Sequence, residues 1–280
     1  MKTKIPLLGA IGLLLSCQSL VLENRINCPS MLLFDIENAD AFDGVNHVHI
    51  AAYTQEEEDF LTADTTVVDD IQNQSFYLKV KKSDAVKGYG VMGYEGARKK
   101  GEFQWVVDRG ANYVPLFRFA YHKVPAREES VLIPVEFVKD FSRVTIHFTH
   151  FDQFEKAGGR LPFRLSITGN TIGIDASTGI PVKGEFCYEP EEESAGTFRF
   201  IVPRQADHSL TMELYGIPEL GQEEGLADAF NLWTLFREQT DFSWEAKNLA
   251  DINLEFDYTE AKFRISVAEW EKGDNLVFEI

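Results

Sequence analysis

Three cysteines, Cys17, Cys28 and Cys187, are the residues of this sequence with the most clearly defined chemistry. A thiol can be acylated, can be oxidised to a disulfide, or can act as a nucleophile once it is deprotonated. Cys17 closely follows an apolar run, Ile5–Leu15, which begins after two lysines. Because a membrane-spanning helix needs about 20 apolar residues, this shorter run predicts a cleaved secretory signal peptide over residues 1–16.

The four residues around the expected cleavage point, Leu14–Cys17, resemble the lipobox of bacterial lipoproteins. The resemblance implies that the Cys17 thiol receives diacylglycerol, that the chain is cut before Cys17, and that the new amino group is acylated. Several acyl chains give durable attachment, because each buried methylene contributes about 0.8 kcal/mol and one chain alone is marginal. We therefore expect a lipidated tether over residues 17–27. An ordinary signal peptide followed by a cysteine is the alternative.

Two cysteines, Cys28 and Cys187, remain once Cys17 is lipidated. In an exported protein, two such thiols can form a disulfide, which here would join the start of the folded part to its second half. Two separate thiols are the other interpretation, and the sequence leaves both open.

The histidines do not form a recognisable metal site. His47 and His49 share one face of an expected strand, but no third or fourth ligand of a suitable type lies nearby. His147 and His150 are three residues apart, which places them on opposite faces of a strand. We expect no metal and no cofactor.

Common catalytic motifs are missing from the sequence. It contains no Gly-x-Ser-x-Gly elbow, no His-Glu-x-x-His and no phosphate-binding Gly-x-x-x-x-Gly-Lys loop. Carboxylates are abundant, so a glycosidase pair stays open, although abundance does not define a pair. We predict a protein that is not an enzyme.

The four tryptophans, Trp105, Trp233, Trp244 and Trp270, have two interpretations. They can pack in β-sandwich cores, or some of them can form a platform on which sugar rings stack. Core packing is the simpler interpretation.

The charge of the chain is strongly acidic, with 45 Asp and Glu against 27 Lys and Arg and a net charge of −18. Removal of residues 1–16 takes away two lysines and no acid, so the net charge of the mature chain becomes −20. Nucleic acid is excluded as a partner, because phosphate binding requires clustered basic residues.

Period-two alternation of apolar residues dominates the chain after residue 27 and predicts a mainly β protein. The expected strands are Met31–Ile36, Val45–Tyr53, Ser75–Val80, Tyr113–Tyr121, Val131–Phe137, Arg143–Thr149, Phe163–Gly169, Phe198–Val202, Leu210–Tyr215, Ile252–Tyr258 and Lys262–Ala268. One amphipathic helix is expected over Leu226–Gln239, where Phe230, Trp233 and Phe236 follow at three-residue spacing.

A polar break at residues 139–142 divides the expected strands into two groups. Each group approaches the seven strands of a small β-sandwich. We therefore expect two antiparallel β-sandwich domains in tandem, an N-terminal one over residues 28–141 and a C-terminal one over residues 142–280.

Several short segments, in this order, resemble the fimbrium-anchoring lipoproteins of Bacteroidales-type bacteria, which are relatives of the fimbrillins. After the lipobox these segments are Asn27–Pro29, Ser142–Ile146, Phe230–Phe236, Ala250–Tyr258 and Ile265–Trp270. The resemblance implies two transthyretin-like β-sandwich domains. It also implies attachment to the outer membrane through lipid at Cys17, and a place at the base of a fimbrium, where the protein anchors the fibre and limits its length.

The partners expected from this resemblance are fimbrial subunits, joined by β-strand addition, in which a strand of one subunit completes a sheet of another. A lipidated fimbrillin precursor for the stalk or tip is one alternative, with a protease cutting after Arg25 or Arg127. A surface glycan-binding lipoprotein is the other.

Overall fold

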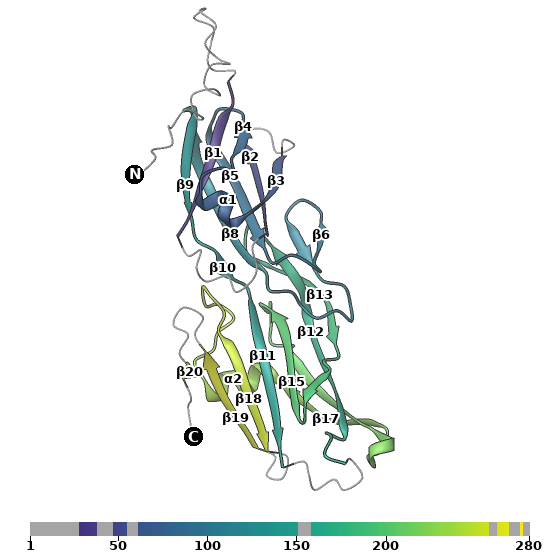
Figure 1. Ribbon diagram of the computed structural model, residues 1–280. Helices are drawn as coiled ribbons and strands as arrows, with labels where there is room; N and C mark the ends of the chain where they lie inside the picture. The colour runs from purple at the N-terminus through teal and green to yellow at the C-terminus, as the bar shows by residue number, and fades with distance from the viewer. Residues whose placement is uncertain are drawn as a thin grey trace, which may run out of the picture.

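The computed structural model describes residues 28–37, 47–54, 61–150, 158–257, 262–268 and 275–276. β-Strands dominate both halves of the chain (Figure 1). The predicted signal peptide, Cys17 and the tether lie outside these residues. Within the described part, no helix has the length and apolar character needed to cross a membrane.

The first half of the chain forms two packed sheets. Its elements are β1 (Ser30–Ile36), β2 (His47–Thr54), β3 (Leu61–Val67), α1 (Val68–Gln72), β4 (Leu78–Val80), β5 (Ser83–Met92), β8 (Phe117–Ala126), β9 (Ser130–Val135) and β10 (Val138–Lys139). The described strands are arranged as β4-β1-β9 in one sheet and β10-β8-β5-β2-β3 in the other. The ring centroid of Phe34 on β1 lies 6.1 Å from that of Phe119 and 5.7 Å from that of Tyr121, both on β8. The inner faces of the two sheets therefore share one core.

The second half is also built from two sheets. Its elements are β11 (Phe141–Thr149), β12 (Phe163–Asp175), β13 (Pro181–Tyr188), β14 (Glu192–Ser194), β15 (Thr197–Pro203), β16 (Thr211–Gly216), the 3-10 helix η5 (Pro218–Leu220), β17 (Gly225–Asn231), α2 (Leu232–Gln239), β18 (Asp251–Asp257), β19 (Lys262–Ala268) and β20 (Asn275–Leu276). One described sheet has the order β14-β15-β11-β18-β19-β20. The other contains β17-β16-β12, and β13 also pairs with β12. A ring contact of 5.5 Å between Phe230 on β17 and Phe256 on β18 joins their inner faces.

Alternation along β11 shows why these residues form strands. Val144, Ile146 and Phe148 are fully buried, whereas the alternate residues Arg143 and His147 are exposed and Thr145 is half-buried. Successive side chains of a strand point to opposite faces, so this spacing buries one face and leaves the other to solvent. The prediction of a mainly β fold with tandem sandwiches is confirmed.

Two strand pairs differ from the antiparallel arrangement expected from the sequence. β1 runs parallel to β9, with Leu32 beside Val131, and β11 runs parallel to β18, with Val144 beside Ile252. Parallel neighbours cannot be joined by a short hairpin and need a long connection. Each pair here is separated by about a hundred residues of chain, which local sequence patterns do not report.

A short hairpin, β6 (Arg98–Lys100) and β7 (Gln104–Val106), links the sheets of the two halves. β7 pairs with β12, and Gly173 lies beside Val106 in that register. A Cβ atom at Gly173 would lie 2.0 Å from the carbonyl oxygen of Trp105, so this close approach requires glycine. The hairpin precedes residue 141 in sequence but belongs to a sheet of the second half. The boundary between residues 141 and 142 stays a prediction.

The expected helix over Leu226–Gln239 is wrong in its first half. Residues 225–231 form β17, which pairs with β16, and the helix occupies only residues 232–239. The side chain of Asn231 accepts a hydrogen bond from the Thr234 amide and caps the helix there. Backbone pairing with β16 thus overrides the three-residue spacing of the aromatic side chains.

Buried charges hold the two halves together where β10 passes into β11. We call Arg118, Lys139, Asp140, Arg204 and Asp251 the junction cluster. The fully buried carboxylate of Asp140 lies 2.5 Å from Arg118 Nε and 2.7 Å from Arg204 Nε. The fully buried Lys139 ammonium lies 2.6 Å from Asp251 Oδ1. Arg118 and Lys139 lie on β8 and β10, Asp140 lies between β10 and β11, and Arg204 and Asp251 follow β15 and begin β18, so the cluster joins both halves.

Burial acts against both central charges of the junction cluster. It raises the pKa of Asp140, and the guanidinium groups of Arg118 and Arg204 oppose that rise. Burial also lowers the pKa of Lys139, and Asp251 opposes that fall. Removal of water from a charge is costly unless partners replace it. The cluster therefore stabilises the junction only while it is complete.

Replacement of Asp140 should destabilise the protein strongly. Asp140→Ala leaves two guanidinium groups without their shared carboxylate, and loss of one partner of a buried pair costs about 3–5 kcal/mol. Denaturant unfolding monitored by tryptophan fluorescence measures the loss. Asp108→Ala is the matched control, because it breaks the exposed Arg98–Asp108 pair and should change the unfolding free energy little. Equal effects of the two substitutions would contradict the assigned role of the junction cluster.

Candidate functional site

The first strand is held inside its sheet. β1 pairs with β9 along residues 31–36 on one side, and its first three residues, 30–32, pair with β4 on the other. Leu32, Phe34 and Ile36 point inward and are 0%, 1% and 8% exposed. In the described part, this makes β1 the central strand of a three-stranded sheet. If β1 were absent, β4 and β9 would border an apolar groove.

Aromatic contacts fix β1 in place. The ring of Phe34 packs against Phe76, Phe119 and Tyr121, at centroid distances of 6.4, 6.1 and 5.7 Å. The Tyr121 hydroxyl donates a hydrogen bond of 3.2 Å to the carbonyl of Ala51. Phe34 is therefore the main anchor of the first strand in the core.

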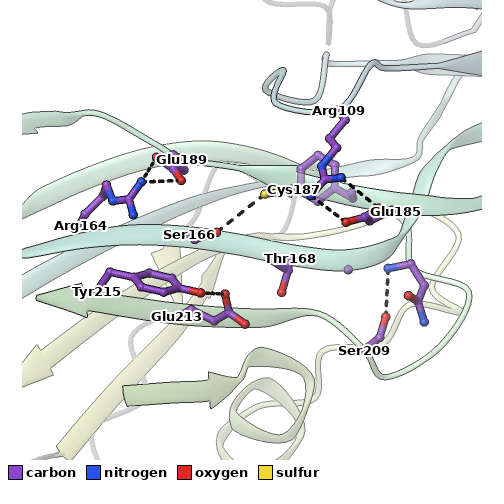
Figure 2. A pocket seen from close by; sticks show the side chains of 13 residues that line it. Arg109, Arg164, Ser166, Thr168, Glu185, Cys187, Glu189, Ser209, Glu213 and Tyr215 are labelled. Atoms are coloured by element: carbon purple, nitrogen blue, oxygen red, sulfur yellow. Dashed lines mark hydrogen bonds and ion pairs between the residues drawn. The ribbon is translucent and has the colours of Figure 1, made fainter. Parts of the chain in front are cut away.

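A groove of about 530 Å³ lies on the outer face of β12, β13 and β16 (Figure 2). Small polar side chains, Ser166, Thr168 and Cys187, line its centre. Two exposed ion pairs lie near its ends, Arg109–Glu185 at 2.9 Å and Arg164–Glu189 at 2.7 Å. The Tyr215 hydroxyl donates to Glu213 at 2.9 Å, and the Arg164 guanidinium lies 5.4 Å from the ring of Tyr215.

The chemistry of this groove is that of a polar binding surface. Its hydroxyls, carboxylates and guanidinium groups offer both donors and acceptors of hydrogen bonds. Cys187 Sγ lies 3.9 Å from Ser166 Oγ, and no histidine is among the described lining residues to act as a base for the thiol. Sequence reasoning missed this groove. Alternating polar positions on β12, Arg164-x-Ser166-x-Thr168, are the signal that marks its outer face.

The cysteines have different outcomes. Cys17 lies outside the described residues, so its lipidation stays a prediction. Cys187 is a free thiol in the groove. Cys28 precedes β1, whose first residue lies beside Val80, whereas Cys187 lies on β13 beside Thr168. No disulfide joins Cys28 and Cys187 in this structure: Cys28 lies before β1 in the first half of the chain, whereas Cys187 lies on β13 in the second half.

The histidines predicted not to form a metal site have separate partners. His47 lies 3.7 Å from Glu95, whereas His49 is half-buried and its ring packs 5.4 Å from that of Trp105. Burial lowers the pKa of His49 to about 4, and the nearby charge of Lys99 contributes to the same direction. His49 is therefore neutral near pH 7. No group of three metal-ligating side chains occurs among the described residues.

The second pair of histidines is also divided. His147 Nδ1 lies 2.9 Å from the Thr197 hydroxyl on β15. His150 Nδ1 lies 3.2 Å from Asp257 at the end of β18. The two rings therefore contact different strands.

Tryptophans pack mainly in the interior. Trp105 and Trp244 are 5% and 6% exposed, as the core interpretation predicts. Trp233 is half-buried, and its ring stacks on His208 at a centroid distance of 4.5 Å. Trp270 lies outside the described residues. No open tryptophan platform is formed by the three that are described.

Two packed β-sandwiches in tandem define the class of this protein. Within that class, the chain is similar to the fimbrial anchor protein Mfa2 from Porphyromonas gingivalis, with a TM-score of 0.57 and 11% identity over 89% of this chain and 99% of that one. It is also similar to a proposed adhesin from Bacteroides ovatus, with a TM-score of 0.58 and 15% identity over 90% of this chain and 95% of that one. A third similar structure is a proposed polysaccharide-binding protein from Bacteroides thetaiotaomicron, with a TM-score of 0.60 and 10% identity over 90% of this chain and 99% of that one.

The similarity to solved structures covers both sandwiches, so this chain has the fold of the fimbrial and adhesin group of proteins. The resemblance to fimbrium-anchoring proteins is thereby confirmed at the level of fold. No family model matches the sequence. No curated protein matches it either.

Truncation of Phe34 tests how firmly β1 is held. Phe34→Ala removes the ring that contacts three aromatic neighbours and should lower the unfolding free energy by about 3–5 kcal/mol. Leu132→Ala on β9 is the control, since Leu132 is 49% exposed and its loss should have a small effect. Urea unfolding of both variants measures the difference. A small loss in Phe34→Ala would show that β1 is only loosely held.

Thiol counting tests the arrangement of cysteines. Two reactive sulfurs are expected in unfolded, unreduced mature protein, because Cys28 and Cys187 are not joined, while lipidated Cys17 cannot react. Mass spectrometry after alkylation counts them directly. Zero reactive sulfurs would establish the disulfide, and three would show that Cys17 is not lipidated.

Proposed function

We propose that this chain is a lipid-anchored outer-membrane protein, without enzymatic activity, that anchors a fimbrium to the cell surface and limits its length. Three features support this proposal. The fold is shared with a protein described as a fimbrial anchor. A lipobox-like segment ends at Cys17, only eleven residues before Cys28. The first strand is central in its sheet and leads directly back to that segment.

The distribution of basic residues carries the choice of an anchor over a stalk subunit. From Ile26 to Leu78 the chain contains no lysine and no arginine. This stretch covers β1, β2 and β3. An arginine-directed or lysine-directed protease therefore has no site at which to separate β1 from β2. The first strand stays in its sheet, and the groove between β4 and β9 stays filled.

Cleavage after Arg25 or Arg127 would not release β1 alone from its sheet. A cut after Arg25 would detach the predicted lipid but leave β1 in place. A cut after Arg127 would fall in the turn between β8 and β9, where the Arg127 side chain pairs with Asp84. It would separate β9 from the rest of its sandwich instead of releasing β1 alone.

A retained first strand explains how such a protein would end a fibre. A subunit that receives a neighbour's strand needs an open position in its sheet. The position between β4 and β9 is occupied by β1. Growth by strand insertion at this position stops here, and lipid at Cys17 holds the terminal subunit at the membrane. Fimbrial subunits are the partners, and the outer membrane is the location.

A surface glycan-binding protein is the second candidate function. The polar groove on β12, β13 and β16 favours it, because hydroxyls and charged side chains suit sugar recognition. The similarity to a proposed polysaccharide-binding protein points the same way. Loss of an anchor should detach the fibres, whereas loss of a glycan-binding protein should leave their attachment unchanged.

Deletion of the gene tests the proposed function. We expect cells without the protein to release fimbriae that are longer than those of the parent and are found in the medium. Electron microscopy and measurement of fimbrial protein in cell and medium fractions detect this change. A Cys17→Ser variant should give the same release, because it cannot be lipidated.

A Cys28→Ser variant provides the matched control, since it changes the neighbouring cysteine and should keep fibres attached. Loss of all fibres after deletion would favour a stalk subunit. Fibres of normal length that remain attached would favour the glycan-binding function.

A further inference from the structure

One strand, β17, is open at its edge and exposed over most of its length. β17 pairs with β16 on one side and has no strand on its other side in the described part. Its first five residues, 225–229, are all exposed, and Leu226 is 56% exposed. Figure 1 shows β17 in the lower part of the second half, far from β1. An open edge strand is a template for pairing with another chain.

The register defines which backbone groups of β17 point outward. The Leu232 amide donates to the Leu210 carbonyl at 2.9 Å, so this pair is hydrogen-bonded. In an antiparallel ladder such pairs alternate, which turns the amide and carbonyl of Ala229 away from β16. The outward amide of Ala229 donates to the carboxylate of Asp228 at 2.8 Å. One aspartate thus covers this donor until a partner strand replaces it.

Other long edges in the described part are less suited to pairing. β9 is interrupted by Pro134, which has no amide hydrogen. The outer edge of β13 is partly covered, because the Cys187 carbonyl accepts from the Gly110 amide. Among residues 62–67 of β3, whose burial is described, none is a large exposed hydrophobic side chain. β9 also carries an exposed leucine, Leu132, whereas β17 combines an open edge and an exposed leucine with a strand that contains no proline.

Charge defines the partner that would pair with β17. Between Arg204 and Arg237 the sequence contains six acidic residues and no lysine or arginine; the acids are Asp207, Glu213, Glu219, Glu223, Glu224 and Asp228. This stretch includes β16, η5 and β17. The only charged side chains of this stretch are therefore acidic, which attracts a basic segment to the edge and repels an acidic one.

We propose that β17 is a docking edge at which an extended, lysine-bearing or arginine-bearing segment of another protein adds as a strand. The segment pairs with the outward groups of Ala229, covers Leu226 and brings its basic side chains to Glu223, Glu224 and Asp228. That this segment comes from a fimbrial subunit rests on the proposed function. The position of the edge and the charge of its partner are argued from the structure and the sequence and do not rest on that function.

The edge is tested with peptides. The probes are two capped nine-residue peptides of alternating valine and threonine, in which two threonines are replaced by lysine in one peptide and by glutamate in the other. The lysine peptide should bind the mature protein at least tenfold more tightly, as measured by fluorescence anisotropy, and high salt should reduce the difference. Equal affinity of the two peptides would overturn the proposal.

Ala229→Pro should abolish binding, because proline removes the outward amide without removing a bond to β16. Ala229→Val is its control, since valine keeps the amide. Glu223→Gln with Glu224→Gln should weaken binding of the lysine peptide severalfold, whereas Glu128→Gln with Glu129→Gln in the turn after β8 should not. These surface changes keep the test valid if Ala229→Pro fails to fold. Unchanged binding in both Ala229→Pro and the double variant Glu223→Gln with Glu224→Gln would refute docking at this edge.

Fimbriae collected from the medium of the deletion strain supply the second probe. They should bind the immobilised mature protein and lose at least tenfold in affinity with Ala229→Pro. If the lysine peptide binds but fimbriae do not, the docking edge stands and the fimbrial function is wrong. If fimbriae bind equally to the wild type, to Ala229→Pro and to the Glu223→Gln, Glu224→Gln double variant, the function stands and docking at β17 is wrong.

Discussion

The buried carboxylate of Asp140 is the constraint on which the arrangement of the two sandwiches depends. The chain passes from β10 in a sheet of the first half to β11 in a sheet of the second with only this residue between them. Asp140 is held from both sides, by Arg118 on β8 and by Arg204 after β15. Its own carbonyl accepts from the Arg204 amide at 2.9 Å. Since none of these charges can be removed singly without leaving another unpaired in the interior, the junction cannot relax gradually.

Topology gives the first strand a similar all-or-none character. β1 lies parallel to β9, although β2 to β8 lie between these two strands in the sequence. Parallel neighbours need a long connection, and the sequence between β1 and β3 contains no lysine or arginine at which a trypsin-like protease could cut. Burial of Phe34 and the missing cleavage site therefore act together: one holds the strand in the core, and the other prevents its removal.

The sequence predicts the parts of the fold that depend on local alternation. β11 and β18 have uninterrupted apolar spacing and were expected within one or two residues. β5 was missed because it contains Gly88 and Gly90; a Cβ at Gly88 would lie 2.1 Å from the Ala51 carbonyl oxygen, so contact with β2 requires the residue that hides the strand pattern. The groove and the junction cluster were missed for another reason. Arg109 and Glu185, or Asp140 and Arg204, are far apart in sequence and meet only through sheet pairing.

The acidic composition, which argues against a nucleic-acid partner, has a more specific effect on strand pairing at β17. An exposed edge strand normally endangers its own protein, because two copies can pair through the same edge. Here that pairing would bring Glu223, Glu224 and Asp228 of one copy against the same residues of another, and this like-charge contact is unfavourable. A basic segment that pairs with the same edge would instead bring positive charges against these carboxylates, which is favourable. The same carboxylates that keep copies of the chain apart therefore leave the edge available, without a covering helix or an interrupting proline, to a partner of opposite charge.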